Sequence, residues 1–187
     1  MSQIKKQQLI FLDTETTGLN PDVHEVIQIG GVIVSQDWTS SNTPTFEMVE
    51  QFELKIKPER IEDADPTALR VNGYDAADWV FAYTAKEAMT ILADKAKGAI
   101  MVAHNVAFDH MFIEKAFRNV GIENTMHYHK LDTISIAFAK LHTNHDIEKF
   151  SLRALGEYFS IENKQAHTAL SDARATFELY QKLMQMK

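Results

Sequence analysis

An apolar run that ends in two acids constrains the fold of this chain more than any other feature. Leu9–Leu12 is short, unbroken and apolar, which is typical of a buried central strand, and Asp13 and Glu15 follow it closely. Alternate side chains of a strand share a face, so the two carboxylates should project together. Close carboxylates repel each other and resist desolvation, and a bound cation removes both costs. The alternative is a strand end with two solvated acids.

Composition favours one α/β domain over residues 1–187, with a core at about 8–184. The chain is 45% hydrophobic and 24% charged, as in soluble globular proteins, and it has no cysteine for disulfides or thiolate metal sites. Its net charge of −7 disfavours electrostatic coating of nucleic acid but leaves room for an enzyme that grips a strand end. We see neither a signal peptide nor a membrane-spanning segment, and expect a cytoplasmic protein without membrane contact.

Periodicity and turn signals predict a mixed α/β sheet covered by helices. A stretch rich in Ser, Thr and Asn, Gln36–Thr45, is predicted to be a loop. Asp65 and Thr84 are predicted helix N-caps, the latter in a capping box with Glu87. The predicted strands are Leu9–Leu12, Val26–Ser35, Phe46–Lys57 and Ala99–Ala103, and the predicted helices are Pro66–Asn72, Thr84–Lys97, Ala107–Val120, Thr133–Leu141, Leu152–Phe159 and Thr168–Met186.

Two further acids lie near predicted helix starts. Asp109 falls in the first turn of a helix for which Asn105 is the natural N-cap, and Asp172 falls near the start of the last helix. His167 precedes Asp172 by five residues, which is about 140° around an ideal helix, so the two side chains converge only if His167 lies before the helix. The alternatives are a plain first-turn helix acid and a surface histidine beside a solvated acid.

Taken together, the four carboxylates and the histidine indicate phosphodiester hydrolysis. Ligation by oxygen alone suits hard cations such as Mg²⁺ and Mn²⁺. Two such ions about 3.5–4 Å apart stabilise both the attacking and the leaving oxygen of an in-line displacement. A histidine with a near-neutral pKa is a suitable base for the attacking water.

These segments resemble the signature of the DEDDh (DnaQ-like) 3′→5′ exonucleases, whose members include ribonuclease T and the proofreading epsilon subunit of bacterial DNA polymerase III. Asp13 and Glu15 match the Asp-x-Glu motif, and His104-Asn105 with Phe108-Asp109 matches the second motif. The third, His-x-Ala-x-x-Asp, is matched by His167, Ala169 and Asp172. The resemblance implies a ribonuclease H-like fold with a central mixed five-stranded sheet flanked by helices.

The resemblance also implies roles and cofactors. Two divalent cations, Mg²⁺ or Mn²⁺, are implied: Asp13 would bridge both, Glu15 and Asp172 would complete the first site, and Asp109 would serve the second. His167 would be the general base. The implied substrate-binding residues, around the terminal nucleotide, are Thr16, Thr17, Leu19, Val71, Asn72, His104, Asn105 and Phe108.

Substrate preference is less specified. The stretches around Asn72-Gly73 and His104–His110 resemble ribonuclease T, yet Leu19 and Val71 stand where that enzyme places aromatic rings, and only Phe108 keeps one. Stacking on an aromatic ring contributes about 1–3 kcal/mol per base, so a relaxed base preference is expected. Aliphatic residues at such positions resemble the DNA-trimming members. We predict exonuclease action on single-stranded 3′ ends, DNA favoured over RNA.

Other interpretations stay open from the sequence. They are ribonuclease T-like trimming of RNA 3′ ends, a proofreading subunit bound to a DNA polymerase, and an inactive nucleic-acid-binding module, which the intact catalytic positions disfavour. A homodimer is a further partner that the resemblance to ribonuclease T implies. His127 and His129 suggest zinc only weakly, and a surface loop is the preferred interpretation. Asp132 is predicted to cap the helix that begins at Thr133.

Overall fold

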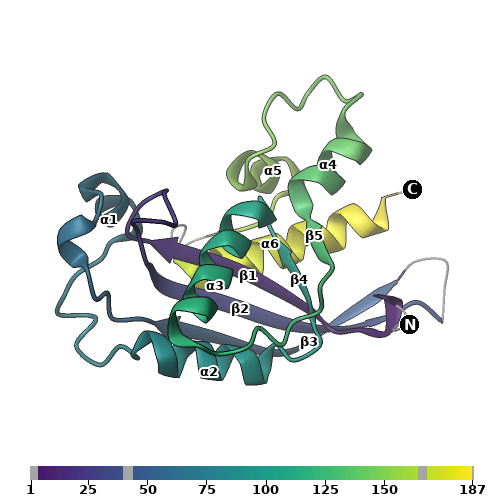
Figure 1. Cartoon of the computed structure of the whole chain (residues 1–187). Coiled ribbons are helices and arrows are strands. Elements are labelled where there is room, and N and C mark those ends of the chain that lie inside the picture. The colour runs from purple at the N-terminus through teal and green to yellow at the C-terminus, as the bar shows by residue number, and fades with distance from the viewer. Residues whose placement is uncertain (1–3, 40–43, 164–167, 187) are drawn as a thin grey trace.

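A five-stranded mixed sheet forms the centre of the computed structural model, which describes residues 4–39, 44–163 and 168–186 (Figure 1). In spatial order the strands are β3 (Thr45–Lys55), β2 (Val26–Asp37), β1 (Leu9–Thr16), β4 (Ile100–Ala103) and β5 (Lys130–Asp132). β2 runs antiparallel to β1 and β3, whereas β4 runs parallel to β1 and β5. This sheet confirms the implied fold class.

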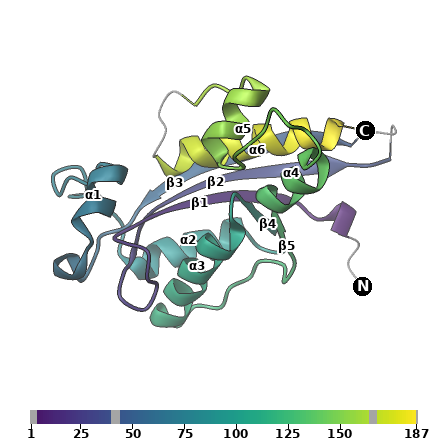
Figure 2. The same ribbon diagram turned by 90° about the horizontal axis from the view of Figure 1, so that it is seen from above.

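Helices cover both faces of the sheet. Figure 2 shows α2 (Ala85–Lys95) and α3 (Val106–Val120) on one face and α5 (Leu152–Phe159) and α6 (Ala169–Gln185) on the other. No helix among the described residues is both long enough and apolar enough to span a bilayer. The helices are α1 (Pro66–Asn72), α2 (Ala85–Lys95), α3 (Val106–Val120), α4 (Thr133–Leu141), α5 (Leu152–Phe159) and α6 (Ala169–Gln185), with 3₁₀ turns at Ile4–Lys6 and Ile61–Asp63.

The central position of β1 follows from its being apolar on both faces. Leu9 and Phe11 belong to the core cluster that includes residues of α6, while Ile10 and Leu12 belong to the cluster with α2 and α3. All four side chains are fully buried. Because strand side chains alternate, the residues at positions 13 and 15 continue the face that carries Leu9 and Phe11. The strand therefore directs its two acids toward α6.

Gly30 allows the first turn of α6 to approach this strand. It is the β2 partner of Asp13, and a Cβ atom built on it would lie 2.1 Å from the carbonyl carbon of Ala169. The backbone of α6 thus rests on a position where a side chain cannot fit. Asp172 belongs to that same first helical turn. The glycine consequently brings Asp172 close to the acids of β1.

We expect Gly30→Ala to destabilise the protein by about 1–3 kcal/mol, because the added methyl can enter only if the α6 backbone moves. The same movement should weaken divalent-cation binding by Asp172. Urea unfolding and Mn²⁺ titration measure the two effects. Gly156→Ala is the matched control, since its new Cβ would meet nothing closer than 3.8 Å. Equal stability and equal Mn²⁺ affinity of Gly30→Ala and wild type would contradict this account.

Most predicted element ends are confirmed. The Asp65 side chain accepts a hydrogen bond from the Thr67 backbone, and Gly73 ends α1 with a φ of 67°. Thr84 and Glu87 form the predicted capping box, although α2 ends two residues earlier than expected. The predicted α4 and α5 agree with the observed helices, and α6 differs by one residue at each end. β2 runs to Asp37 and β3 begins at Thr45, so the predicted loop is shorter.

One strand was missed and one local prediction is wrong. β5 has only three half-buried residues and no apolar run, so no strand was predicted there from the residue pattern. Asn105 is not a side-chain N-cap: its φ is 72° and its side chain makes no capping hydrogen bond. The Asp132 carboxylate instead accepts bonds from the backbone N–H groups of Asn105 and Val106. The start of α3 is therefore stabilised from β5 rather than by its own N-cap.

Candidate active site

Three of the predicted acids converge between β1 and α6. Asp13 and Glu15 lie on β1 and Asp172 lies in the first turn of α6. One carboxylate oxygen from each lies within 4.8 Å of those of the other two, and all three residues are half-buried. Within the part of the chain that the structure describes, no other group of three or more histidines and acids lies close enough together to share one ion. The set contains only oxygen donors, which fits Mg²⁺ or Mn²⁺.

Asp109 reaches the same strand from α3. β4 pairs with β1 only as far as Phe11, so the edge of β1 beyond that residue is free of β4. There the backbone N–H and the hydroxyl of Thr14 both donate to Asp109 Oδ1, at 2.9 and 2.8 Å. Asp109 is 3% exposed. The acid thus completes the strand's hydrogen bonding beside Asp13, and the predicted fourth carboxylate lies at the cluster.

Burial and the charges of neighbouring acids make Asp13, Glu15 and Asp109 costly to ionise together. Burial, followed by the charges of the other three acids, holds the pKa of Asp13 well above its usual range. Burial, with the charges of Asp172 and Asp109, raises the pKa of Glu15 to about 8. Burial raises the pKa of Asp109 to about 7, against the lowering effect of the Thr14 hydrogen bonds. A divalent cation would remove this repulsion, so the electrostatics of the donor set fit a metal site.

The pKa of Glu15 predicts that the metal-free protein loses stability as the pH rises from about 5 to about 8. In this window the folded protein holds a proton that the unfolded chain, with a carboxyl pKa near 4.5, has lost. One pKa unit corresponds to about 1.4 kcal/mol, so the loss should be measurable by urea unfolding in a chelator. Glu15→Gln should flatten the slope, and Mg²⁺ should reverse it. A stability that rises with pH in this window would contradict the assignment.

An amide and a hydroxyl, neither anticipated from the sequence, hold Asp172. Asn163 Nδ2 donates to Asp172 Oδ1 at 2.5 Å, and the Ser171 hydroxyl lies 2.6 Å from Asn163 Oδ1. Asn163 lies nine residues before the acid and outside α6, so no helical spacing signals the contact. Arg153 and Gly156 of α5 line a cavity of about 370 Å³ beside this pair.

The segment after β1 is fixed by internal hydrogen bonds. Asn72, predicted to bind substrate, is buried and donates from Nδ2 to the Thr16 carbonyl at 3.0 Å. The N–H and carbonyl of Thr17 bond to the backbones of Glu25 and Asp65. Thr16 and Thr17 are themselves buried. Thr16 and Thr17 are therefore held in place by hydrogen bonds within the protein, which use the Thr16 carbonyl and both backbone groups of Thr17.

The remaining predicted substrate residues differ in exposure. Leu19 is 77% exposed and Val71 is 54% exposed, and both fractions are high for aliphatic side chains. Phe108 is half-buried, and its ring packs 4.9 Å from that of Phe112. The exposed Asn105 has the left-handed backbone described above. These four positions leave apolar and polar surface available to a ligand.

His104 is engaged within the protein through both ring nitrogens. Nε2 lies 3.0 Å from the Phe150 carbonyl and Nδ1 lies 3.0 Å from the Thr133 hydroxyl. Burial lowers the pKa of His104, so the ring is neutral at neutral pH. Because a carbonyl only accepts, the Nε2 proton of His104 is donated to the Phe150 carbonyl. The Thr133 hydroxyl, which lies beside Nδ1, also donates to the Ala103 carbonyl at 3.2 Å. His104 thus joins the end of β4 to α4 and to the segment before α5. His167, the predicted base, lies outside the described residues.

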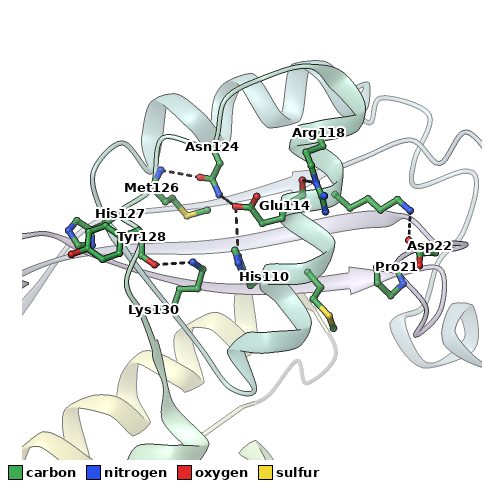
Figure 3. Close-up of a pocket in the computed structure, with 12 residues that line it drawn as sticks. Pro21, Asp22, His110, Glu114, Arg118, Asn124, Met126, His127, Tyr128 and Lys130 are labelled. Atoms are coloured by element: carbon green, nitrogen blue, oxygen red, sulfur yellow. Dashed lines mark hydrogen bonds and ion pairs between the residues drawn. The ribbon is translucent and has the colours of Figure 1, made fainter.

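A pocket of about 790 Å³ lies on the outer face of α3, away from the acid cluster (Figure 3). It contains none of the four acids. Figure 3 shows His110 and Glu114 projecting from α3 between the turn that carries Asp22 and the loop after α3. The rings of His127 and His129 stack in that loop, with centroids 5.0 Å apart. The three-ligand group in the described residues is the carboxylate cluster, so we place the candidate metal site there.

The sheet order and the acid cluster define the class of this protein. Residues 10–180 match the protein family RNase_T, described as "Exonuclease", and the chain belongs to that family. The chain is 32% identical over 183 residues to DNA polymerase III subunit epsilon of Escherichia coli K12, covering 91% of this chain and 69% of that one. It is 29% identical over 182 residues to ribonuclease T of Shewanella baltica, covering 91% and 78%.

Longer relatives share the same region. DNA polymerase III PolC-type of Caldanaerobacter subterraneus subsp. tengcongensis is 30% identical over 180 residues, and the match covers 95% of this chain but 12% of the polymerase. Escherichia coli exonuclease I in complex with a dT13 oligonucleotide has the same fold, with a TM-score of 0.79 at 18% identity, over 96% of this chain and 41% of that one. The chain therefore corresponds to only part of these proteins.

Proposed function

We propose that this protein is a metal-dependent 3′→5′ exonuclease that acts on single-stranded ends, with DNA favoured over RNA. The observation that carries the proposal is the convergence of Asp13, Glu15 and Asp172 within 4.8 Å of one another. Asp109, bonded to Thr14 on the same strand, adds the fourth acid. Membership of an exonuclease family supports hydrolysis of phosphodiester bonds by these residues.

Two divalent cations, Mg²⁺ or Mn²⁺, fit the donor set. We propose that Asp13, Glu15 and Asp172 hold one ion and that Asp13 and Asp109 hold the second. When bound, the ions supply positive charge at the attacking and leaving oxygens of the scissile phosphate. His167 would take the proton of the attacking water. The acids lie on β1, which is a strand of the sheet, and on α3 and α6, which pack against that strand. Their positions are therefore fixed before substrate arrives.

The exposed aliphatic side chains support a preference for DNA and a low selectivity among bases. Leu19 and Val71 offer apolar contact without a ring on which a base can stack. Phe108 supplies one ring, and together with the hydrogen-bonded segment at Thr16 and Thr17 it would hold the terminal nucleotide. The structural likeness to exonuclease I solved with dT13 is in keeping with single-stranded DNA as the substrate.

Two alternatives have specific support from the relatives. Similarity to the epsilon subunit and to PolC-type polymerase favours a proofreading role with a polymerase partner. Similarity to ribonuclease T favours trimming of RNA 3′ ends, and with it a homodimer. Co-purification with a polymerase would support the first alternative, and sedimentation as a dimer would support the second. A cytoplasmic location stays a prediction.

The experiment that tests the proposal offers 5′-labelled single-stranded DNA, single-stranded RNA and duplexes with 3′ overhangs, in Mg²⁺ and in Mn²⁺. We expect stepwise shortening of single-stranded DNA, slower shortening of RNA, and arrest where a duplex begins. Faster digestion of RNA than of DNA would replace the DNA preference with the ribonuclease alternative. Inactivity on all three substrates in both metals would overturn the proposed function.

A further inference from the structure

We propose that Asn163 is a positioning residue for the metal site and that it acts through Asp172. This inference rests on the proposed function and assigns a further residue to the same site. Asn163 Nδ2 lies 2.5 Å from Asp172 Oδ1, a short hydrogen bond to a carboxylate. Asp172 belongs to the three-acid cluster, and Asn163 contributes no charge to it.

The hydrogen-bond network fixes which way the amide faces. Asn163 Nδ2 donates to Asp172 Oδ1, so the NH₂ group of the amide points at the acid. The amide oxygen then faces the Ser171 hydroxyl, which donates to it at 2.6 Å. Ser171 and Asp172 are adjacent in the first turn of α6, so the amide bridges two consecutive side chains of that turn. A flipped amide would set its oxygen against the carboxylate.

The consequence for the site is a fixed orientation of Asp172. With Oδ1 bonded to the amide, the carboxylate of Asp172 cannot rotate freely, so its orientation within the cluster with Asp13 and Glu15 is restrained. Asn163 is neutral, so it restrains Asp172 by a hydrogen bond without adding charge to the cluster. Hydrogen-bond partners of metal ligands change metal affinity or activity by about 10–100-fold when they are removed.

The test measures Mn²⁺ affinity on the whole protein without substrate, by the electron paramagnetic resonance signal of free Mn²⁺. We expect wild type to bind Mn²⁺ and Asn163→Ala to bind it about 10–100-fold more weakly, with a nearly unchanged melting temperature in chelator. Ser171→Ala should weaken binding less, because only the restraint on the amide is lost. It also serves as the test if Asn163→Ala does not fold.

Asn124→Ala is the matched control. Asn124 Nδ2 donates to Glu114 Oε1 at 2.5 Å, and Asn124 Oδ1 accepts from the Met126 backbone, in the outer pocket of α3 (Figure 3). Its loss removes an equivalent bond away from the acid cluster, so Mn²⁺ affinity should not change. Equal affinity of Asn163→Ala and wild type would overturn the proposal. An equal loss in Asn124→Ala would also overturn it.

Nuclease assays separate this inference from the proposed function. In Asn163→Ala the Mn²⁺ concentration for half-maximal rate should rise by about 10–100-fold, while the rate at saturating Mn²⁺ should return to near that of wild type. A rate that stays low at saturating metal would contradict a positioning role through Asp172. If wild type binds Mn²⁺ but degrades no nucleic acid, the proposed function fails while the binding data still decide the role of Asn163.

Discussion

Asp13→Asn should lower exonuclease activity by at least about 10³-fold while making the metal-free protein more stable. The substitution keeps the shape of the side chain and removes a charge that is shared between both proposed metal ions. Burial and the neighbouring acids hold the pKa of Asp13 well above its usual range, so its ionised form is unfavourable in the folded protein without metal. Removing the charge removes that cost, so the metal-free Asp13→Asn protein should have a higher free energy of unfolding than wild type at pH 8.

The two effects have opposite signs, which separates catalysis from folding. Urea unfolding in chelator at pH 8 measures stability, and release of mononucleotides in Mg²⁺ measures activity. Asp22→Asn is the matched control, because Asp22 is exposed and pairs with Lys115 at 2.8 Å outside the cluster. It should leave the activity unchanged. A less stable Asp13→Asn protein in chelator would contradict the repulsion that we assign to the cluster.

Replacing Asp109 by Asn or by Ala should lower exonuclease activity by at least about 10²-fold, but only Asp109→Ala should also destabilise the fold. In the native protein the Thr14 N–H and hydroxyl lie 2.9 and 2.8 Å from Asp109 Oδ1. In Asp109→Asn the amide oxygen should still accept both hydrogen bonds. In Asp109→Ala both donors lose their acceptor in a buried place. Each unsatisfied buried donor costs about 1–3 kcal/mol.

Thermal and urea unfolding of the two variants, with activity assays in Mg²⁺, test this separation. Thr14→Val is a useful companion, because it removes the hydroxyl donor and keeps the acid. It should retain more activity than either Asp109 variant. Full activity of Asp109→Asn would remove this acid from the proposed metal site, and equal stability of Asn and Ala variants would contradict the structural role of the Thr14 bonds.

The central strand and the acids on it were predictable from the sequence because they follow from local patterns. An unbroken apolar run gives a strand buried on both faces, and alternation then directs Asp13 and Glu15 to one face. Helix ends with local caps, such as Asp65 and Thr84, were predictable for the same reason. The approach of Asp109 and Asp172 to β1 required the resemblance to a known family, because no local pattern pairs residues so far apart in sequence.

What the sequence did not reveal depends on contacts between distant segments. Gly30 reads as an ordinary strand glycine until the backbone of Ala169 is seen against it. Asn163 reads as a loop residue until its amide is seen to bond Asp172. The capping of α3 by Asp132 of β5 was missed because asparagine is a common N-cap residue, whereas Asn105 has a left-handed backbone and makes no side-chain capping bond.

Digestion of 5′-labelled single-stranded DNA, with and without full chelation, tests the central claim most directly. We predict a ladder of products shortened from the 3′ end in Mg²⁺ or Mn²⁺, no products in excess chelator, and recovery when the metal is restored. The Asp13→Asn protein should give no ladder under the same conditions. Cleavage that survives chelation, or an equal ladder from the Asp13→Asn protein, would contradict a metal-dependent exonuclease centre at this carboxylate cluster.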